Sequence, residues 1–224
     1  FLVPFVFVVL VAAWHLASKY LVSSQLILPE PMAVWNALWD ALTTGPFWGK
    51  QSVYFHFWDT AKISLVGFLI GAVAWIVLGI MLAQSQLLMR AVGPYITAFQ
   101  ALPRIAIAPI MVIWFGQGFL SNVIITATVV FLPVLVSTIS GLETVDRGLL
   151  EMLRGFSASR WQTLRKVSFW SALPSIFAGL QVGIVFSVVG AIVAEWVGAN
   201  AGLGVILLQS QYNMDIPRSF AILI

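Results

Sequence analysis

Long stretches with few or no charged residues dominate the pattern of this chain. A transmembrane helix needs about 20 consecutive apolar residues, and most of these stretches are long enough for one. The stretch from Ile105 to Leu142 carries no charge and is too long for a single helix, and Gly116-Gln117-Gly118 predicts a turn within it. We therefore expect spanning helices near residues 1–22, 61–84, 91–115, 120–141 and 171–193, with the start of a sixth after Pro217, cut off at Ile224.

The segments between these spans predict further short elements. Residues 23–59 are mixed in polarity and are expected to form an external loop, which Pro29-Glu30-Pro31 interrupts. From Met32 to Leu42, apolar residues fall on one helical face, and a helix of that length is expected to lie at the membrane surface because it is too short to span. Gly202-Leu203-Gly204 predicts a turn before a short helix at 205–212.

The composition supports the assignment of these segments as membrane spans and excludes cysteine-based chemistry. Hydrophobic residues make up 61% of the chain and charged residues 8%, against about 25% charged residues in soluble domains. The ten tryptophans fit aromatic belts at the membrane interfaces. The absence of cysteine excludes disulfides and thiolate metal sites. Because the chain begins with Phe1, we expect it to be a fragment of a longer protein, without a signal peptide.

The basic residues concentrate in one loop. Residues 143–170 contain Arg147, Arg154, Arg160, Arg165 and Lys166. Because cytoplasmic loops carry an excess of Lys and Arg, this loop is expected to be cytoplasmic, together with the N-terminus and the loop that carries Arg90. Arg218 then falls on the outer side as an exception to the rule. The loops expected outside are 23–59, 116–119 and 196–216.

The cytoplasmic loop itself predicts two short helices. The first runs from Asp146 to Arg154 with its leucines on one side, and a break follows at Gly155-Phe156-Ser157-Ala158. Ser159-Arg160-Trp161-Gln162 has the form of a capping box, so a second helix is expected to begin at Ser159. Two interpretations stay open at this point. The loop either only fixes the topology or presents its apolar stripe to a protein partner.

A family resemblance rests on several segments in order. Val145 to Ile184 (VDRGLLEMLRGFSASRWQTLRKVSFWSALPSIFAGLQVGI) resembles the EAA loop of ABC-importer permeases. Four further segments resemble the nitrate, sulfonate and taurine branch of that family: Leu28 to Pro31, Leu102 to Gly116 (LPRIAIAPIMVIWFG), Phe131 to Val136, and Ala194 to Gly204 (AEWVGANAGLG). The resemblance implies an all-α polytopic type I permease fold of about six transmembrane helices. It also implies a single permease domain over 1–224 and a cytoplasmic coupling helix within 143–170.

The resemblance also implies function and partners. The chain would be the permease of an ATP-driven importer in a bacterial inner membrane, translocating a small anionic nutrient such as a sulfonate, nitrate or an aromatic acid. Its partners would be a second permease copy in a homodimer, two cytoplasmic ABC ATPases, and a periplasmic or lipid-anchored binding protein. Nucleic acid is not expected as a partner.

The chain itself carries no machinery for energy conversion. No Walker A pattern and no metal-ligand cluster occurs in it. We therefore expect no enzymatic activity, no catalytic residue and no cofactor in this chain, with ATP and Mg²⁺ bound by the partner ATPase. The alternative is a stand-alone secondary transporter or channel. Such proteins usually carry intramembrane carboxylates and internal repeats, whereas here only Glu195 lies near the membrane and no clear repeat occurs.

The resemblance assigns ATPase coupling to Glu151, Arg154, Ser157, Arg160, Leu173 and Pro174. Glu151 matches the motif glutamate and would contact the ATPase or cap the neighbouring turn, the alternative being a solvated surface carboxylate. Ser157 stands where the motif has glycine, and Leu173-Pro174 lies four residues later than the motif's Leu-Pro. Because a left-handed turn costs serine more than glycine, either Gly155 takes over the turn or the loop has shifted locally.

One charge is expected in the middle of the membrane. In a continuous third span, Arg104 would lie roughly 20 Å from Ala91 and about 18 Å from Gly116. The alternative is a helix broken at the flanking Pro103 and Pro109. An arginine in mid-membrane costs at least about 2.5 kcal/mol unless it faces a cavity or a partner. Arg104, with Gln100, is therefore a candidate for the substrate path that favours anions, and Trp114 is a candidate gate residue. Snorkelling, or pairing with a carbonyl freed by a proline, is the alternative for Arg104.

At the outer end of the fifth span, Glu195 would contact the binding protein, or cap or pair locally. The second reading is favoured because carboxylates are common near helix ends. Gly202 and Gly204 are candidates for the external gate or for binding-protein contact.

Overall fold

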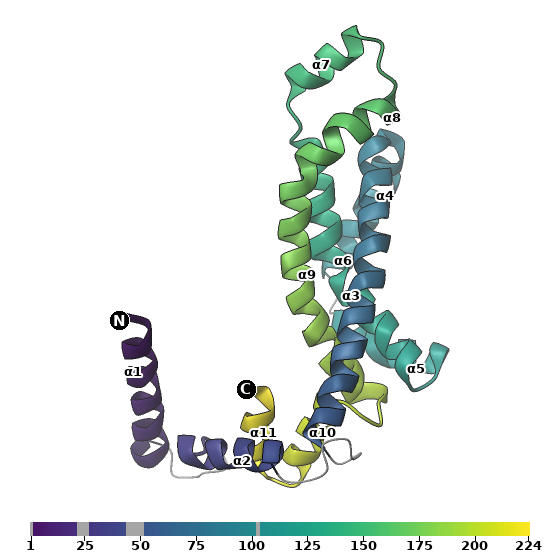
Figure 1. Ribbon diagram of the computed structural model, residues 1–224. Helices are drawn as coiled ribbons and strands as arrows, with labels where there is room; N and C mark the ends of the chain where they lie inside the picture. Colours follow the sequence, from purple (N-terminus) through teal and green to yellow (C-terminus); the bar gives the residue numbers. More distant parts are fainter. Residues whose placement is uncertain (1, 22–26, 44–51, 102–103) are drawn as a thin grey trace. The chain divides into compact units, whose positions relative to one another are not determined.

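The computed structural model describes residues 2–21, 27–43, 52–101 and 104–224, which form helices joined by short connections (Figure 1). The chain divides into two compact units. Phe1–Thr60 and Ala199–Ile224 make up one, here called the terminal unit. Ala61–Gly198 makes up the other, here called the central unit.

The terminal unit joins both ends of the chain. It contains α1 (Leu2–Leu16) with a π-helical turn at Ala17–Leu21, α2 (Pro31–Thr43), α10 (Leu203–Tyr212) and α11 (Ile216–Leu223). The indole Nε1 of Trp14 donates a 3.0 Å hydrogen bond to the carbonyl of Pro29, and the ring stacks on Phe220 at a centroid distance of 6.2 Å. Helix α11 also packs along α2. The helices predicted at 32–42 and 205–212 are confirmed as α2 and α10.

Helix α3 (Val53–Gln84) begins earlier than the predicted start near residue 61. Its first two turns, up to Thr60, belong to the terminal unit. The sequence suggested a loop end at Asp59, but the helix continues through Asp59 and Lys62. Charged residues three positions apart share one helix face, where they can favour the helix instead of ending it. The predicted external loop 23–59 therefore includes the start of a long helix.

The central unit holds the remaining elements. These are the rest of α3, α4 (Gln86–Ala101), a 3₁₀ turn (Arg104–Ile107), α5 (Ala108–Phe115), α6 (Phe119–Glu143), α7 (Arg147–Gly155), α8 (Arg160–Thr163), a π-helical turn (Leu164–Ser168) and α9 (Phe169–Gly198). From Arg160 to Gly198 the helix is uninterrupted. Among the described residues, four helices are long and apolar enough to cross a membrane: Val3–Tyr20, Val53–Gln84, Phe119–Glu143 and Arg160–Gly198.

Helix α6 forms the core of the central unit and packs antiparallel to α9 (Figure 1). Glycines of α9 permit this close approach. A methyl group at Gly179 would lie 2.7 Å from the carbonyl oxygen of Pro133, and one at Gly190 would lie 3.2 Å from the Cα of Thr126. Small residues at such contacts are how transmembrane helices gain van der Waals packing without a hydrophobic driving force between them.

Helix α3 runs parallel to α6. Gly67 faces Thr126 and Gly79 faces Thr138, so both helices advance in the same direction. The indole of Trp75 supports this contact by donating a 2.8 Å hydrogen bond to the carbonyl of Ala127. This arrangement agrees with the predicted alternation of the second, fourth and fifth spans. Which end faces the cytoplasm stays a prediction.

The third span predicted over 91–115 is broken. Helix α4 ends at Ala101, and the chain resumes with the 3₁₀ turn at Arg104 before α5. Pro109 lies in the first turn of α5, where its missing N–H leaves no hydrogen bond unmade. Leu102 and Pro103 lie outside the described residues. The break that the sequence left open is therefore present, and the depth inferred for Arg104 from a continuous helix no longer applies.

Candidate functional site

Helix α7 begins with a side-chain cap. A carboxylate oxygen of Asp146 accepts hydrogen bonds from the backbone N–H groups of Gly148 at 2.6 Å and Leu149 at 3.2 Å. The cap satisfies two donors that the first turn of a helix leaves without partners, and its negative charge suits the positive end of the helix dipole. This confirms the short helix predicted from Asp146. The helix could be predicted because the residues that define it are neighbours in the sequence.

The end of α7 is a Schellman turn centred on Ser157. Ser157 N–H donates to the carbonyl of Arg154 at 2.9 Å, and Ala158 N–H donates to the carbonyl of Leu153 at 3.0 Å. Ser157 itself has φ +56°, in the left-handed region that favours glycine. Gly155 remains the last residue of α7. The suggestion that Gly155 takes over the turn is wrong, since the serine adopts the conformation for which the motif has glycine.

Helix α8 begins with the predicted capping box. Ser159 Oγ accepts from the backbone N–H of Gln162 at 3.2 Å, and Gln162 Oε1 accepts from the backbone N–H of Ser159 at 2.9 Å. This confirms the helix start at Ser159. Since α8 continues into α9, the orientation of the loop relative to the long helix is set by the turn between Ser157 and Ser159.

Several large apolar side chains of this loop are exposed, but most of the predicted apolar stripe is not. Leu149, Met152, Phe156 and Trp161 are exposed, and Phe156 reaches 78%. Of the remaining predicted stripe, Leu150 and Leu153 are half-buried and Leu164 is buried. Charged side chains lie between the four exposed apolar ones on the same two helices: Glu151, Arg154 and Arg160 are also exposed. We call these seven residues the α7–α8 surface. An exposed patch of large apolar side chains bordered by charges is typical of a surface that another protein covers.

Leu173 and Pro174 lie farther inside the helix than the sequence suggested. The helix that starts at Ser159 runs on through a π-helical turn, in which Phe169 N–H donates to the carbonyl of Leu164, and continues as α9. The span predicted near 171–193 would put Pro174 in its first turn, whereas the proline lies in the interior of a helix that begins at Arg160. Pro174 is exposed and Leu173 half-buried.

The proposed path residues lie on separate elements. Gln100 is exposed near the end of α4, and Trp114 is 69% exposed on α5. The backbone of Arg104 forms part of the 3₁₀ turn, while its side chain lies outside the described residues. Helix α5 is fixed by Ala108, which packs in an apolar cluster with Ile125 and Ala194.

Glu195 and the two glycines belong to different units. Glu195 lies in the central unit, near the end of α9, and is 2% exposed. This burial favours the local structural role over contact with an external protein. Gly202 and Gly204 lie in the terminal unit and are both buried at the start of α10.

Two side chains of α3, His56 and Thr60, bind the N-terminus of α10, a contact that was not predicted from the sequence; we call this pair the clamp. The backbone N–H of Gly202, at φ +127°, donates to Nδ1 of His56 at 2.9 Å. The next N–H, of Leu203, donates to Oγ1 of Thr60 at 2.8 Å. Side chains four residues apart on α3 thus satisfy two donors at a helix start. The signal was a histidine and a threonine four positions apart, on one face near the start of a mostly apolar helix.

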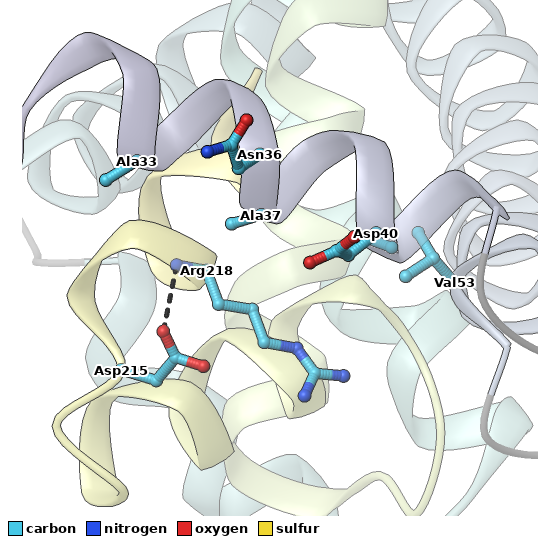
Figure 2. A pocket seen from close by; sticks show the side chains of 8 residues that line it. Ala33, Asn36, Ala37, Asp40, Val53, Asp215 and Arg218 are labelled. Carbon is cyan, nitrogen blue, oxygen red and sulfur yellow. Dashed lines mark hydrogen bonds between the residues drawn. The ribbon is translucent and has the colours of Figure 1, made fainter.

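A cavity of about 690 Å³ lies within the terminal unit. Figure 2 shows Asp40 of α2 and the guanidinium of Arg218 of α11 extending into it. Asp215 also lines the cavity, and its carboxylate accepts from the backbone N–H of Arg218 at 3.2 Å, which caps α11. Arg218, noted in the sequence only as an exception to the charge rule, is therefore part of a charged cavity. No group of three His, Cys, Asp or Glu that could hold a metal occurs among the described residues.

The comparisons with known proteins agree with these features. The family model described as "Binding-protein-dependent transport system inner membrane component" matches residues 75–224. The riboflavin transport system permease protein RibX of Chloroflexus aurantiacus is 33% identical, covering 98% of this chain and 80% of the relative. The formylaminopyrimidine transport permease protein ThiX of Halalkalibacterium halodurans is 31% identical over 96% of this chain and 83% of its own length.

A third relative belongs to the sulfonate branch. The putative aliphatic sulfonates transport permease protein SsuC of Escherichia coli is 30% identical over 90% of this chain and 74% of its own length. The resemblance to that branch is thereby confirmed. The chain belongs to the family of binding-protein-dependent transport system inner membrane components: it is the transmembrane permease subunit of an ABC importer, not its ATPase, and it works with a partner ATPase that binds ATP and with a binding protein.

Proposed function

We propose that this permease translocates a small organic nutrient by alternating access, and that the α7–α8 surface is where the partner ATPase transmits its movement. The observation that carries the proposal is the exposure of Met152, Phe156 and Trp161 on a loop that is well ordered by its own caps. Such side chains gain free energy only when a partner removes them from water. ATP-driven closure of the ATPases would then move α7, and the long helix from Arg160 would carry the movement to the spans.

Within this surface each coupling residue has a proposed task. Glu151, exposed one position before Met152, makes charge-assisted contacts with the ATPase, as do Arg154 and Arg160. Ser157 sets the angle between α7 and α8. Leu173 and Pro174 act at a distance from the contact, at the point where a helix without one backbone donor can bend.

A coupling assay tests the assignment of Glu151. In the complex reconstituted with ATPase and binding protein, Glu151→Ala is expected to reduce transport per ATP hydrolysed, while Lys166→Ala, also an exposed charge of the loop, serves as the matched control. Unchanged coupling in Glu151→Ala would leave Glu151 as a solvated surface carboxylate.

For the substrate, the proposal is a small heteroaromatic nutrient. Two relatives that cover nearly the whole chain are named for riboflavin and for formylaminopyrimidine. An anionic nutrient such as a sulfonate is the second candidate, supported by the sulfonate permease and by Arg104 beside the end of α4. Calorimetry of the cognate binding protein with riboflavin, a pyrimidine and taurine separates the two. Binding of taurine alone would refute the heteroaromatic proposal.

The assembly is proposed to be a homodimer of permeases with two ATPases. The binding protein is proposed to dock on the outer side at the start of α10, around Gly202 and Gly204, and beside the cavity that holds Arg218. Trp114, exposed on α5, is proposed as a gate residue. Mass measurement of the purified complex tests the dimer, because a single permease per complex would contradict it.

A further inference from the structure

One polar side chain interrupts the exposed face of α9. Between Phe177 and Val189 the exposed residues of this helix are apolar except for Gln181. On α3, by contrast, every exposed residue from Leu65 to Met81 is apolar, as expected of a helix face that lipid covers. The two long helices of the central unit therefore differ in what they present outward.

Gln181 is also far from either end of the apolar segment. It stands 15 positions after Lys166 and 14 before Glu195, which corresponds to roughly 22 Å and 21 Å along a helix. A glutamine side chain cannot reach an aqueous interface over such a distance. An amide left without hydrogen-bond partners in an apolar medium costs about 2–7 kcal/mol. This face of α9 is therefore expected to meet water, solute or protein instead of lipid.

The residues around Gln181 indicate which of these three, water, solute or protein, this face of α9 meets. It lies in a groove of about 580 Å³, whose other walls include Phe68 of α3 and Phe177, Leu180 and Ile184 of α9. Aromatic and aliphatic walls with a single hydrogen-bonding group are the usual composition of a site for a small organic molecule. An amide both donates and accepts, so it suits a solute with polar edges, such as a heteroaromatic ring.

We propose that this groove on α9 lines the translocation pathway and that the amide of Gln181 is the polar contact for the passing solute. The inference rests on the proposed import function and adds the helix face and the residue that meet the substrate. Gln181 determines specificity in this scheme, while the apolar walls contribute contact area to any solute of suitable shape.

The absence of cysteine in this chain permits a direct test by cysteine accessibility. Gln181→Cys and Val182→Cys are each introduced into the assembled complex and treated with the charged reagent 2-sulfonatoethyl methanethiosulfonate. Val182 is the matched control because it lies at the same depth, is 46% exposed and does not line the groove. The thiolate that reacts forms in water and not in lipid, so labelling at position 181 is expected to be at least about tenfold faster.

Labelling is followed with and without ATP and vanadate, and the unlabelled Gln181→Cys complex is first shown to hydrolyse ATP. Equal rates at the two positions, or no reaction at position 181 in any nucleotide state, would overturn the proposal. A disulfide between two copies of Gln181→Cys without labelling would identify a dimer contact and overturn it as well. Loss of ATP-dependent transport in the unmodified complex would instead contradict the proposed function, so the two failures are distinct.

Discussion

Gly202 donates its backbone N–H to Nδ1 of His56 over 2.9 Å, although the two residues lie 146 positions apart in the chain. The bond requires an unprotonated Nδ1, which accepts only in that form. With the neighbouring bond from Leu203 to Thr60, it fixes the start of α10 against the first two turns of α3. The terminal unit thus gains part of its order from a polar contact inside an apolar protein.

Replacing His56 with alanine is expected to destabilise the protein. The change leaves the buried N–H of Gly202 without this partner, at a cost of about 1–3 kcal/mol. Thermal unfolding in detergent measures the effect. His15→Ala is the control, since His15 is exposed on α1. Equal midpoints for the two variants would contradict the role of the clamp.

Replacing Ser157 with glycine is expected to stabilise the protein. The left-handed conformation at Ser157 penalises any residue with a Cβ, and the relief exceeds the added chain entropy by about 0.5–1 kcal/mol. Ser157→Val should destabilise in the same assay, because a β-branched residue suits the turn least. A lower unfolding midpoint for Ser157→Gly than for the unmodified protein would show that the turn is not left-handed in solution.

Replacing Gly179 with alanine is expected to disturb the contact between α6 and α9. The added methyl would lie 2.7 Å from the carbonyl of Pro133 and 2.6 Å from Cβ of Ser137, and overpacking of this kind costs about 1–3 kcal/mol. Gly93→Ala provides the control, since open space surrounds Gly93 on α4. Unfolding that is unchanged in Gly179→Ala would contradict the close packing.

Replacing Phe156 with alanine is expected to weaken ATPase binding without loss of stability. The ring is 78% exposed in this chain, and buried aromatic anchors of interfaces commonly contribute about 2 kcal/mol or more. Co-purification with the ATPase at increasing salt measures the loss. Tyr95→Ala, also exposed but on α4, should leave binding unchanged. Equal binding by both variants would argue against the α7–α8 surface.

Replacing Arg104 with glutamine tests the anionic alternative. If the substrate is an anion, removing the guanidinium is expected to reduce uptake while the complex still assembles. Uptake of radiolabelled taurine in proteoliposomes measures the effect, with Arg90→Gln as the control for a lost arginine elsewhere. An unchanged rate in Arg104→Gln would remove this residue from the path.

Structural features that depend on neighbouring residues could be predicted from the sequence. The short helix after Asp146, the capping box at Ser159 and the Gly116-Gln117-Gly118 turn could all be predicted, since the residues that create them are neighbours in the chain. The break between α4 and α5 could be anticipated from prolines but not decided, because proline bends some helices and ends others.

Contacts between distant segments could not be predicted. Nothing near His56 in the sequence indicates that its partner is Gly202, and the pairing of Gly179 with Pro133 depends on which helices meet. The left-handed Ser157 was also missed, because intrinsic preference favours glycine there and the surrounding hydrogen bonds of the Schellman turn override it.

Uptake by proteoliposomes that contain this permease, its ATPase and its binding protein tests the central claim most directly. Substrate identified with the binding protein is added outside, and ATP is enclosed with the ATPase. We expect accumulation only when ATP and binding protein are both present, and loss of accumulation when an ATPase that cannot hydrolyse ATP is used. Uptake by the permease alone, driven by an ion gradient and indifferent to ATP, would show that the chain works as a secondary transporter and would contradict the account.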